Sequence, residues 1–200
     1  MLNAQPAPEH RLAFLRGFLK RPKEVGSVIP SSRFLERSIV KSAGLESARL
    51  VVELGPGTGG TTRALLRNLG PDAKLLAIEI NPHFAGLLAG HVNDPRLIVH
   101  EGSAADIPSA LKLHGLPAPD VILSGIPFST MSRELGMSIL ESVRDTLSEE
   151  GRFVAYQFRD RVEKLGREVF GRASVTLELL NVPPMHVYRW DKSNSNKASR

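Results

Sequence analysis

Residues 53–59, ELGPGTG, directly follow the apolar run 50–52. They place an acid and three glycines where a strand would turn into a helix. Glycine allows a positive φ and lets a ligand approach the backbone, which a β-carbon would prevent. Gly55, Gly57 and Gly60 also fit the pattern G-x-G-x-x-G, which is weak when it stands alone. The stretch therefore predicts a ligand-binding turn after a strand of an α/β domain.

The acid that opens this stretch indicates the class of ligand. Glu53 would repel the pyrophosphate of a dinucleotide but attract a positively charged group. S-adenosylmethionine carries an ammonium and a sulfonium, so it suits an acid at this place. A second acid, Glu79, ends the next apolar run, where a carboxylate commonly binds both hydroxyls of a ribose. We therefore expect S-adenosylmethionine as the cofactor and regard a nicotinamide cofactor as the weaker alternative.

Length and composition limit the class of protein. The 200 residues suit one domain with a substantial core. The chain has no cysteine, which excludes structural disulfides, cysteine-ligated zinc and thiol nucleophiles. The six histidines do not have the spacing of metal ligands, so we expect no metal site. Neither a membrane-spanning run nor a secretory signal is apparent, and the expected location is cytoplasmic.

The net charge of +5 is concentrated near the N-terminus. Residues 1–50 hold nine Lys or Arg against four Asp or Glu, whereas the rest of the chain is balanced. Residues 10–21 have the period of an amphipathic helix with a basic polar face, so an anionic surface is the expected partner. The residues expected to bind a membrane are Arg11, Phe14, Leu15, Arg16, Phe18, Leu19, Lys20, Arg21 and Lys23.

After Pro22, apolar runs alternate with helical patterns. Strands are expected at 50–54, 74–80, 97–101, 120–124 and 152–158, and helices at 32–43, 61–69, 82–90, 105–113 and 132–147. This alternation predicts a parallel sheet that is covered by helices on both faces. The β-rich runs 175–182 and 185–190 lie close together and predict an antiparallel strand pair at a sheet edge.

Four turns that follow strands carry a family resemblance. Residues 53–59, Glu79, the turn at 101–106 and the turn SGIPF at 124–128 occur in the order found in class I S-adenosylmethionine-dependent methyltransferases. The chain resembles this family over residues 48–190. The resemblance implies a Rossmann-like α/β fold with a seven-stranded, mostly parallel sheet, a C-terminal antiparallel strand pair and N-terminal helices. We expect N-terminal amphipathic and capping helices at 1–47 and the methyltransferase domain at 48–190, and the polar composition of 191–200 predicts a disordered tail.

The same resemblance implies roles for individual residues. The glycines would line the cofactor, Glu53 would face its methionine end and Glu79 would bind its ribose. The family commonly uses Asp in the third turn to hold adenine, whereas this chain would rely on the hydroxyl of Ser103 or the backbone of Ala104. The residues expected to bind the cofactor are Glu53, Gly55, Gly57, Gly59, Glu79, Ser103, Ala104 and Ser124.

The turn after the fourth strand bears on the methyl acceptor. The rRNA adenine dimethylases share the ELGPGTG style and use Asn or Asp there, followed by a proline and an aromatic residue, to hold a base. Ser124 stands in that place and is a shorter, weaker acceptor, which argues against a nucleic-acid base. The stretch 181–184, NVPP, resembles the missing motif. Because it follows the fifth strand, we interpret it as a hairpin turn on another part of the sheet.

Several stretches together indicate a more specific resemblance. FLRGFLKRPKEVGSVIPSS, ELGPGTG, SGIPF and NVPP are similar to stretches of the bacterial soluble phospholipid N-methyltransferases, which convert phosphatidylethanolamine to phosphatidylcholine. The resemblance implies a phospholipid substrate and an N-terminal helix that docks on the anionic inner face of the membrane. Basic residues at such a surface contribute about 1 kcal/mol each, which would give reversible peripheral attachment.

The expected chemistry is attack by an amine on the methyl group of a sulfonium. Positioning and desolvation, not a strong base, are expected to supply most of the acceleration. Tyr156, Phe128 and Ser124 are the candidate catalytic residues that would line the acceptor pocket. Their aromatic members could attract a methylated ammonium through cation–π interaction.

Three alternatives to phosphatidylethanolamine methylation stay open. An rRNA adenine N6-dimethyltransferase would use the basic N-terminus to bind RNA phosphate. An ornithine-lipid N-methyltransferase would act on a different amino-lipid. A lipid-binding module without enzymatic activity is disfavoured because Glu53, Gly57 and Glu79 are all present.

Overall fold

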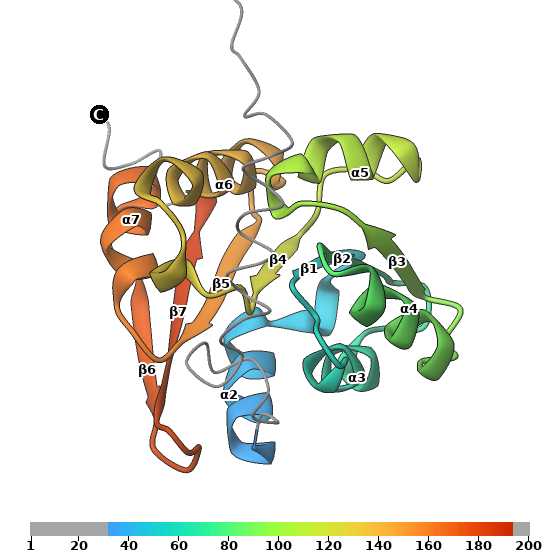
Figure 1. Ribbon diagram of the computed structural model, residues 1–200, viewed down its shortest axis with the longest axis horizontal. Helices are drawn as coiled ribbons and strands as arrows, with labels where there is room; N and C mark the ends of the chain where they lie inside the picture. Colours follow the sequence, from blue (N-terminus) through green and yellow to red (C-terminus); the bar gives the residue numbers. More distant parts are fainter. Residues whose placement is uncertain (1–31, 194–200) are drawn as a thin grey trace, which may run out of the picture.

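The computed structural model of the protein describes residues 32–193 (Figure 1). The predicted helix at 10–21 and the residues expected to bind a membrane lie outside this range, as do residues 194–200 of the predicted tail. Within the described range, no helix is both long and apolar enough to cross a membrane.

Within residues 32–193, seven strands form a single sheet in the order β3-β2-β1-β4-β5-β7-β6. The strands are β1 (Leu50–Leu54), β2 (Lys74–Glu79), β3 (Leu97–Glu101), β4 (Val121–Ser124), β5 (Arg152–Gln157), β6 (Ser174–Glu178) and β7 (Met185–Asp191). The first five are parallel, whereas β7 runs antiparallel to both β5 and β6. The predicted parallel sheet with an antiparallel pair at one edge is thus confirmed.

Helices cover both faces of this sheet (Figure 1). One face carries α2 (Arg33–Ala43), α3 (Gly60–Asn68) and α4 (Pro82–His91), and the other carries α5 (Ile107–Leu113), α6 (Arg133–Thr146) and α7 (Arg161–Phe170). Three short 3-10 helices are η1 (Leu45–Ser47), η2 (Ala104–Asp106) and η3 (Phe128–Thr130). This layered arrangement is the Rossmann-like α/β fold that the sequence predicts.

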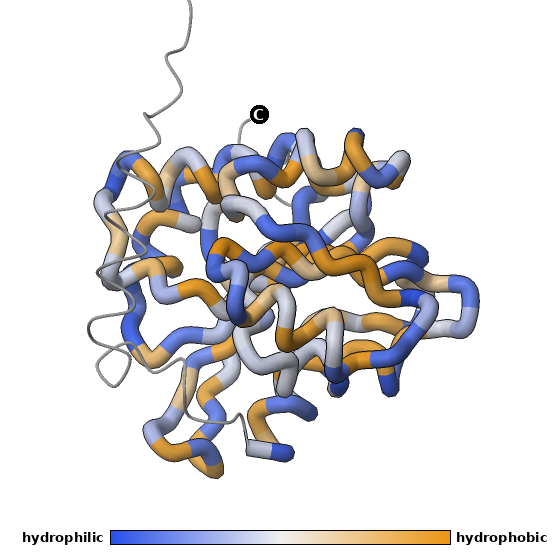
Figure 2. The backbone as a smooth tube through the Cα atoms, turned by 45° about the vertical axis from the view of Figure 1, so that its right-hand side comes forward, coloured by the Kyte–Doolittle hydropathy of each residue, from blue (hydrophilic) through white to orange (hydrophobic). Residues whose placement is uncertain are grey.

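The strands are buried on both sides, which explains their apolar sequences. In β1, Val51 packs in the layer beneath α2 and α3, whereas Val52 packs in the opposite layer. Successive side chains of a strand point to opposite faces, so both faces need apolar residues. Figure 2 shows hydrophobic residues along the strands in the interior of the domain.

Helix α2 is part of this core. Its side chains Leu35, Ile39 and Ala43 are buried and belong to the same hydrophobic cluster as Val51 of β1. The hydroxyl of Ser32 accepts a hydrogen bond from the Leu35 N–H (3.2 Å), which caps the start of the helix. Residues 33–47 therefore pack as an integral part of the α/β domain.

Helix α7 was not predicted from the sequence. Its apolar residues Val162, Leu165 and Val169 are buried and have helical spacing, but Gly166 lies among them. A β-carbon at Gly166 would lie 2.6 Å from the ring of Trp190, so the glycine allows α7 to approach β7 closely. Glycine normally weakens a helix, and here tertiary packing outweighs that cost.

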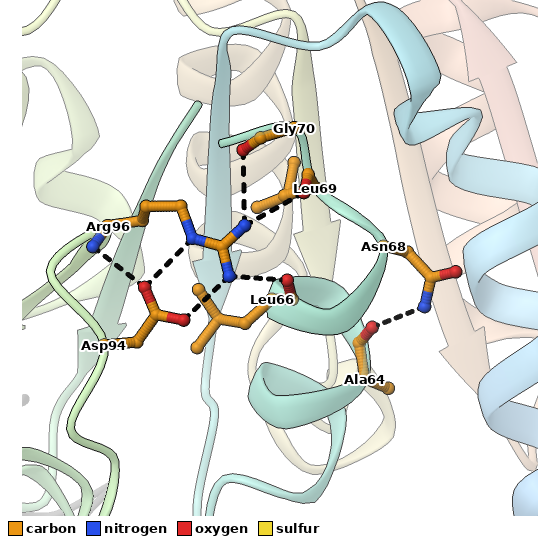
Figure 3. Close-up of polar contacts among 7 residues, drawn as sticks. All are labelled: Ala64, Leu66, Asn68, Leu69, Gly70, Asp94 and Arg96. Carbon is orange, nitrogen blue, oxygen red and sulfur yellow. Dashed lines mark hydrogen bonds and ion pairs between the residues drawn. The ribbon is translucent and has the colours of Figure 1, made fainter. Parts of the chain in front are cut away.

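Arg96 fastens the start of β3 to the end of α3 (Figure 3). Its guanidinium donates hydrogen bonds to the carbonyls of Leu66 (2.8 Å) and Leu69 (2.9 Å), and Asp94 lies 2.7 Å from the same group. These carbonyls belong to the last turn of the helix and to its C-cap, where backbone acceptors lack partners and a cation is favourable. Because the glycine turn lies at the other end of α3, this contact helps to fix the helix that carries the turn.

Candidate active site

The residues predicted to act together meet at one edge of the sheet. Parallel strands β1, β2, β4 and β5 all end at this edge, where ligands of open α/β folds bind. Leu54 is in register with Ser124, and Ser124 with Ala155, which precedes Tyr156. The ends of β1, β4 and β5 are therefore neighbours.

The glycine turn has the backbone that its sequence predicts. Gly55, Gly57 and Gly59 have φ values of 72°, 55° and 82°, a region that other residues rarely adopt. A β-carbon at Gly57 would have no atom within 4 Å, whereas one at Gly59 would lie 2.6 Å from the Leu88 side chain. Gly57 thus borders open space that a ligand could fill.

Glu79 holds this turn in place. One carboxylate oxygen accepts a hydrogen bond from the Gly57 N–H (3.0 Å) and the other from the Asn81 N–H (2.9 Å). Burial raises the pKa of Glu79 above its usual value, and these two hydrogen bonds oppose the rise. A carboxylate can accept more than two hydrogen bonds. Its role toward the ribose stays a prediction.

Glu53 is a buried carboxyl with an unused oxygen. Its side chain is 1 % exposed, and one oxygen accepts a hydrogen bond from the Thr62 hydroxyl (2.6 Å). Among residues 32–193, no group forms a hydrogen bond with the other oxygen. Burial raises the pKa of Glu53 to about 7; Thr62 opposes this rise, and Glu79 adds to it. An acceptor left unpaired in the interior is costly, and a cationic ligand group would satisfy it.

The acceptor side of the edge carries uncharged hydroxyls. Ser124 is fully buried, and its hydroxyl has no hydrogen-bond partner within the described part of the chain. The hydroxyl of Tyr156 lies 3.2 Å from that of Thr61, at a place where a β-carbon on Gly125 would collide with it. Burial and the nearby Glu53 raise the pKa of Tyr156, so the phenol stays neutral at physiological pH. Tyr156 and Ser124 are thus brought to the edge as predicted.

Phe128 does not have the predicted position in the pocket. Its ring is fully buried in the main hydrophobic cluster, together with Leu140 and Leu165. Helix η3 turns the side chain beneath α6, because burying a phenyl ring in the core is more favourable than exposing it at the edge. Phe128 is therefore a core residue and presents no ring face to a ligand.

Ser103 and Ala104 lie after β3 at the same edge. The hydroxyl oxygen of Ser103 accepts a hydrogen bond from the Ala105 N–H (3.2 Å) and caps η2. Ala104 is partly buried against the main cluster. The Ser103 hydroxyl can still donate a hydrogen bond, so a contact with adenine stays a prediction.

Comparison with known proteins identifies the family. The family model described as ribosomal RNA adenine dimethylase matches residues 20–178. The chain belongs to this methyltransferase family. It is an S-adenosylmethionine-dependent N-methyltransferase.

Relatives of this methyltransferase differ in their acceptors. It is 32 % identical over 177 residues to an ornithine lipid N-methyltransferase of Singulisphaera acidiphila, with 88 % of this chain and 92 % of that protein covered. It is 28 % identical over 170 residues to the ribosomal RNA small subunit methyltransferase A of Laribacter hongkongensis, with 81 % and 62 % covered. The match thus spans less than two thirds of that rRNA enzyme.

A solved structure confirms the fold of the methyltransferase. An O-methyltransferase from Bacillus cereus in complex with SAH has a TM-score of 0.65 and 12 % identity, with 94 % of this chain and 93 % of that chain covered. Three features of the ligand-binding edge of the sheet fit S-adenosylmethionine. Glu53 offers an unpaired buried acceptor for a cation, Gly57 borders open space, and Glu79 places a second carboxylate beside the turn.

Two threonines of the methyltransferase were missed by the sequence analysis. Thr61 and Thr62 lie in the first turn of α3 and bond to Tyr156 and Glu53, respectively. They join the cofactor side of the edge to the acceptor side. The available signal was their position directly after the glycines, where hydroxyls of the first turn face the strand ends.

Gln157 of β5 helps to position the turn after β4. Its side-chain amide donates a hydrogen bond to the Ile126 carbonyl (2.7 Å) and so holds this turn in place.

Two histidines that are not adjacent in the sequence of the methyltransferase lie side by side in its structure. His100 Nδ1 lies 3.3 Å from His114 Nε2, and burial lowers the pKa of His100. Over the described residues, no group of three or more His, Cys, Asp or Glu side chains could hold a metal ion.

Proposed function

We propose that this enzyme methylates the amino group of a membrane lipid, with ornithine lipid as the favoured acceptor. The sequence resemblance implies phosphatidylethanolamine and leaves ornithine lipid as an alternative. Similarity to the ornithine lipid enzyme over 92 % of that protein's length supports reversing this order. Phosphatidylethanolamine remains the second candidate because it offers the same primary amine.

The observation that carries the proposal is the chemistry of the acceptor side. Ser124 and Tyr156 place two neutral hydroxyls at the ends of β4 and β5, and β4 ends in this serine in place of an Asn or Asp. A flat exocyclic amine of a base is usually held by such an amide or carboxylate. A flexible aliphatic amine needs only hydroxyl acceptors that orient its nitrogen.

The chain's own residues divide the work between them. Bound S-adenosylmethionine supplies an electrophilic methyl group on a sulfonium. Glu53 would hold its ammonium, while Glu79 keeps the glycine turn in position. Exclusion of water around Ser124 and Tyr156 lowers the pKa of an acceptor ammonium, which makes its lone pair available. Tyr156 keeps its own proton and cannot accept another, so the acceptor ammonium would release its proton to solvent as it enters the site.

The proposal includes a place of action and a partner. Ornithine lipids and phosphatidylethanolamine lie in a bilayer, so the enzyme would act as a peripheral protein at the cytoplasmic face of an anionic membrane. The basic, amphipathic sequence at residues 10–21 supports this location. Nucleic acid would not be a partner.

A labelling experiment tests the proposal. Purified full-length protein is incubated with methyl-labelled S-adenosylmethionine and vesicles that contain ornithine lipid, vesicles that contain phosphatidylethanolamine, or rRNA. We expect label in ornithine lipid, and label in phosphatidylethanolamine alone would retain the class of acceptor while correcting its identity. Label in rRNA alone would overturn the proposal in favour of the activity that gives the family its description.

A further inference from the structure

The turn that joins β6 to β7 exposes an unusual number of large apolar side chains. Leu179, Leu180 and Val182 are 65 %, 62 % and 82 % exposed. Phe158, directly after β5, is 55 % exposed as well. Exposed apolar residues that gather in one place mark a surface for another partner.

This turn lies at the ligand-binding edge. Because β7 runs antiparallel to β5, with Gln157 opposite His186, the turn continues beyond the carboxyl end of β5. Figure 1 shows the β6–β7 hairpin projecting past the sheet beside α2. The turn therefore lies at the same edge of the sheet as Tyr156, which is opposite Val187 of β7 and where the acceptor amine would be held.

Hydrogen bonds hold the turn against the start of α2. Asn181 is 5 % exposed; its side-chain Oδ1 accepts a hydrogen bond from the Ser32 N–H (3.0 Å), and its side-chain Nδ2 donates one to the Pro183 carbonyl (2.8 Å). Leu179 and Leu180 precede this buried asparagine and Val182 follows it, so all three are exposed from a backbone that is held in place. Residues 1–31, with their predicted membrane-binding stretch, join the domain at this point.

Basic side chains lie beside the turn on α2. Arg33, Arg37 and Lys41 are exposed and recur every four residues, which places them on one helix face. Leu35 and Ile39 occupy the buried face. None of the three cations forms an ion pair with any residue from 32 to 193. Apolar side chains flanked by exposed cations match the layers of an anionic bilayer.

We propose that the turn at residues 179–182 inserts into an anionic lipid bilayer while Arg33 and Arg37 contact its phosphates. The inference rests on the proposed function, because a lipid acceptor must reach the edge from a membrane. Insertion at the edge that carries Tyr156 lets an amino head group enter the site while its acyl chains stay in the bilayer. It also gives the enzyme a second membrane contact, separate from residues 10–21.

A fluorescent label on the turn tests the insertion directly. The chain lacks cysteine, so Val182→Cys can be labelled at one position with an environment-sensitive fluorophore. The matched control is Leu113→Cys. Leu113 is 71 % exposed and ends α5, and the chain that follows it runs to the start of β4 at the opposite edge of the sheet. Vesicles of phosphatidylglycerol and phosphatidylethanolamine are compared with vesicles of phosphatidylcholine.

We expect a blue shift at position 182 with anionic vesicles only, and no shift at position 113. Unchanged emission at 182, with the protein bound to vesicles as judged by sedimentation, would overturn the proposal. Blue-shifted emission without vesicles that disappears on deletion of residues 1–22 would show that the chain's own N-terminal segment covers the turn. A shift that grows with protein concentration would show a second copy there. Either result also overturns insertion.

Affinity and activity separate this inference from the proposed function. The variant Leu179→Ser/Leu180→Ser should lower vesicle affinity about tenfold, because less apolar surface is buried, and Arg33→Gln/Arg37→Gln should weaken binding to anionic vesicles only. Both variants should methylate ornithine lipid in detergent micelles at the wild-type rate. Full vesicle affinity in the serine variant would refute the role of the turn, whereas absence of micellar methylation in the wild type would refute the lipid acceptor.

Discussion

The two halves of the ligand-binding edge use different kinds of polar group. The ends of β1 and β2 carry the buried carboxyls Glu53 and Glu79, whereas the ends of β4 and β5 carry the neutral hydroxyls of Ser124 and Tyr156. The difference has a chemical reason. A carboxylate attracts the cationic cofactor, but a carboxylate in direct contact with the acceptor would stabilise the ammonium form, which has no lone pair to attack.

Removal of the charge on the cofactor half should have the largest effect. Glu53→Gln is isosteric and keeps an oxygen for Thr62, yet we expect about 100-fold weaker S-adenosylmethionine binding, since breaking a buried charge pair costs roughly 2–5 kcal/mol. Wild-type affinity should fall as pH drops below about 7, because protons then compete for the carboxylate. Titration calorimetry at several pH values measures both effects. The control is Glu46→Gln on the surface, and a wild-type affinity in Glu53→Gln would contradict the assignment.

The same carboxyl should make the apoprotein less stable as pH rises. Its folded pKa of about 7 lies above the ordinary value of 4.5, so the folded state binds the proton more tightly and loses stability between these pH values. The shift corresponds to roughly 3 kcal/mol at most. Urea unfolding at pH 5 and pH 8 should show a larger loss for the wild type than for Glu53→Gln. Equal losses in the two proteins would mean that Glu53 titrates normally.

Substitutions at two glycines that border open space test whether the cofactor binds against the glycine turn. Gly57 has a φ of 55° and Gly60 lies within α3, yet a β-carbon at either would meet no atom within 4 Å. Gly57→Ala should cost about 1 kcal/mol of stability through backbone strain and weaken cofactor binding about tenfold. Gly60→Ala should be neutral or slightly stabilising. If both variants bind the cofactor equally well, the open space at Gly57 is not the binding site.

The acceptor half can be probed without disturbing the fold. The hydroxyl of Ser124 has no partner among residues 32–193, so Ser124→Ala should change the free energy of unfolding by less than about 1 kcal/mol. We expect about tenfold lower kcat/KM for the lipid, because one oriented hydrogen bond is lost. Steady-state kinetics with mixed micelles measures this. An unchanged kcat/KM would place the amine elsewhere.

The cofactor-binding half of the site could be predicted from the sequence because most of its residues lie close together in the chain. Gly55, Gly57 and Glu53 lie within five residues of one another, and the backbone geometry that they permit is fixed by the turn itself. Glu79 was found because it ends the next strand. Its hydrogen bond to Gly57 spans 22 residues and follows from parallel pairing of β1 with β2.

The acceptor half depends on packing that the sequence does not reveal. Phe128 was expected in the pocket, but η3 buries it beneath α6. Helix α7 was not predicted because Gly166, which allows close packing against Trp190, interrupts the helical pattern of the sequence. The turn containing Asn181 was correctly interpreted as a hairpin, but its place at the ligand edge depends on β7, not β6, pairing with β5.

The hairpin between β6 and β7 also has a consequence for engineering. Its turn lies at the ligand-binding edge of the sheet. It is not part of a strand, and it does not include the glycine turn, Glu53 or Glu79. Residues 179–184 could therefore be exchanged as a cassette, provided that Asn181 keeps its bond to the backbone of Ser32. A library restricted to this cassette would vary the surface that meets the acceptor while leaving the methyl-donor site as it is.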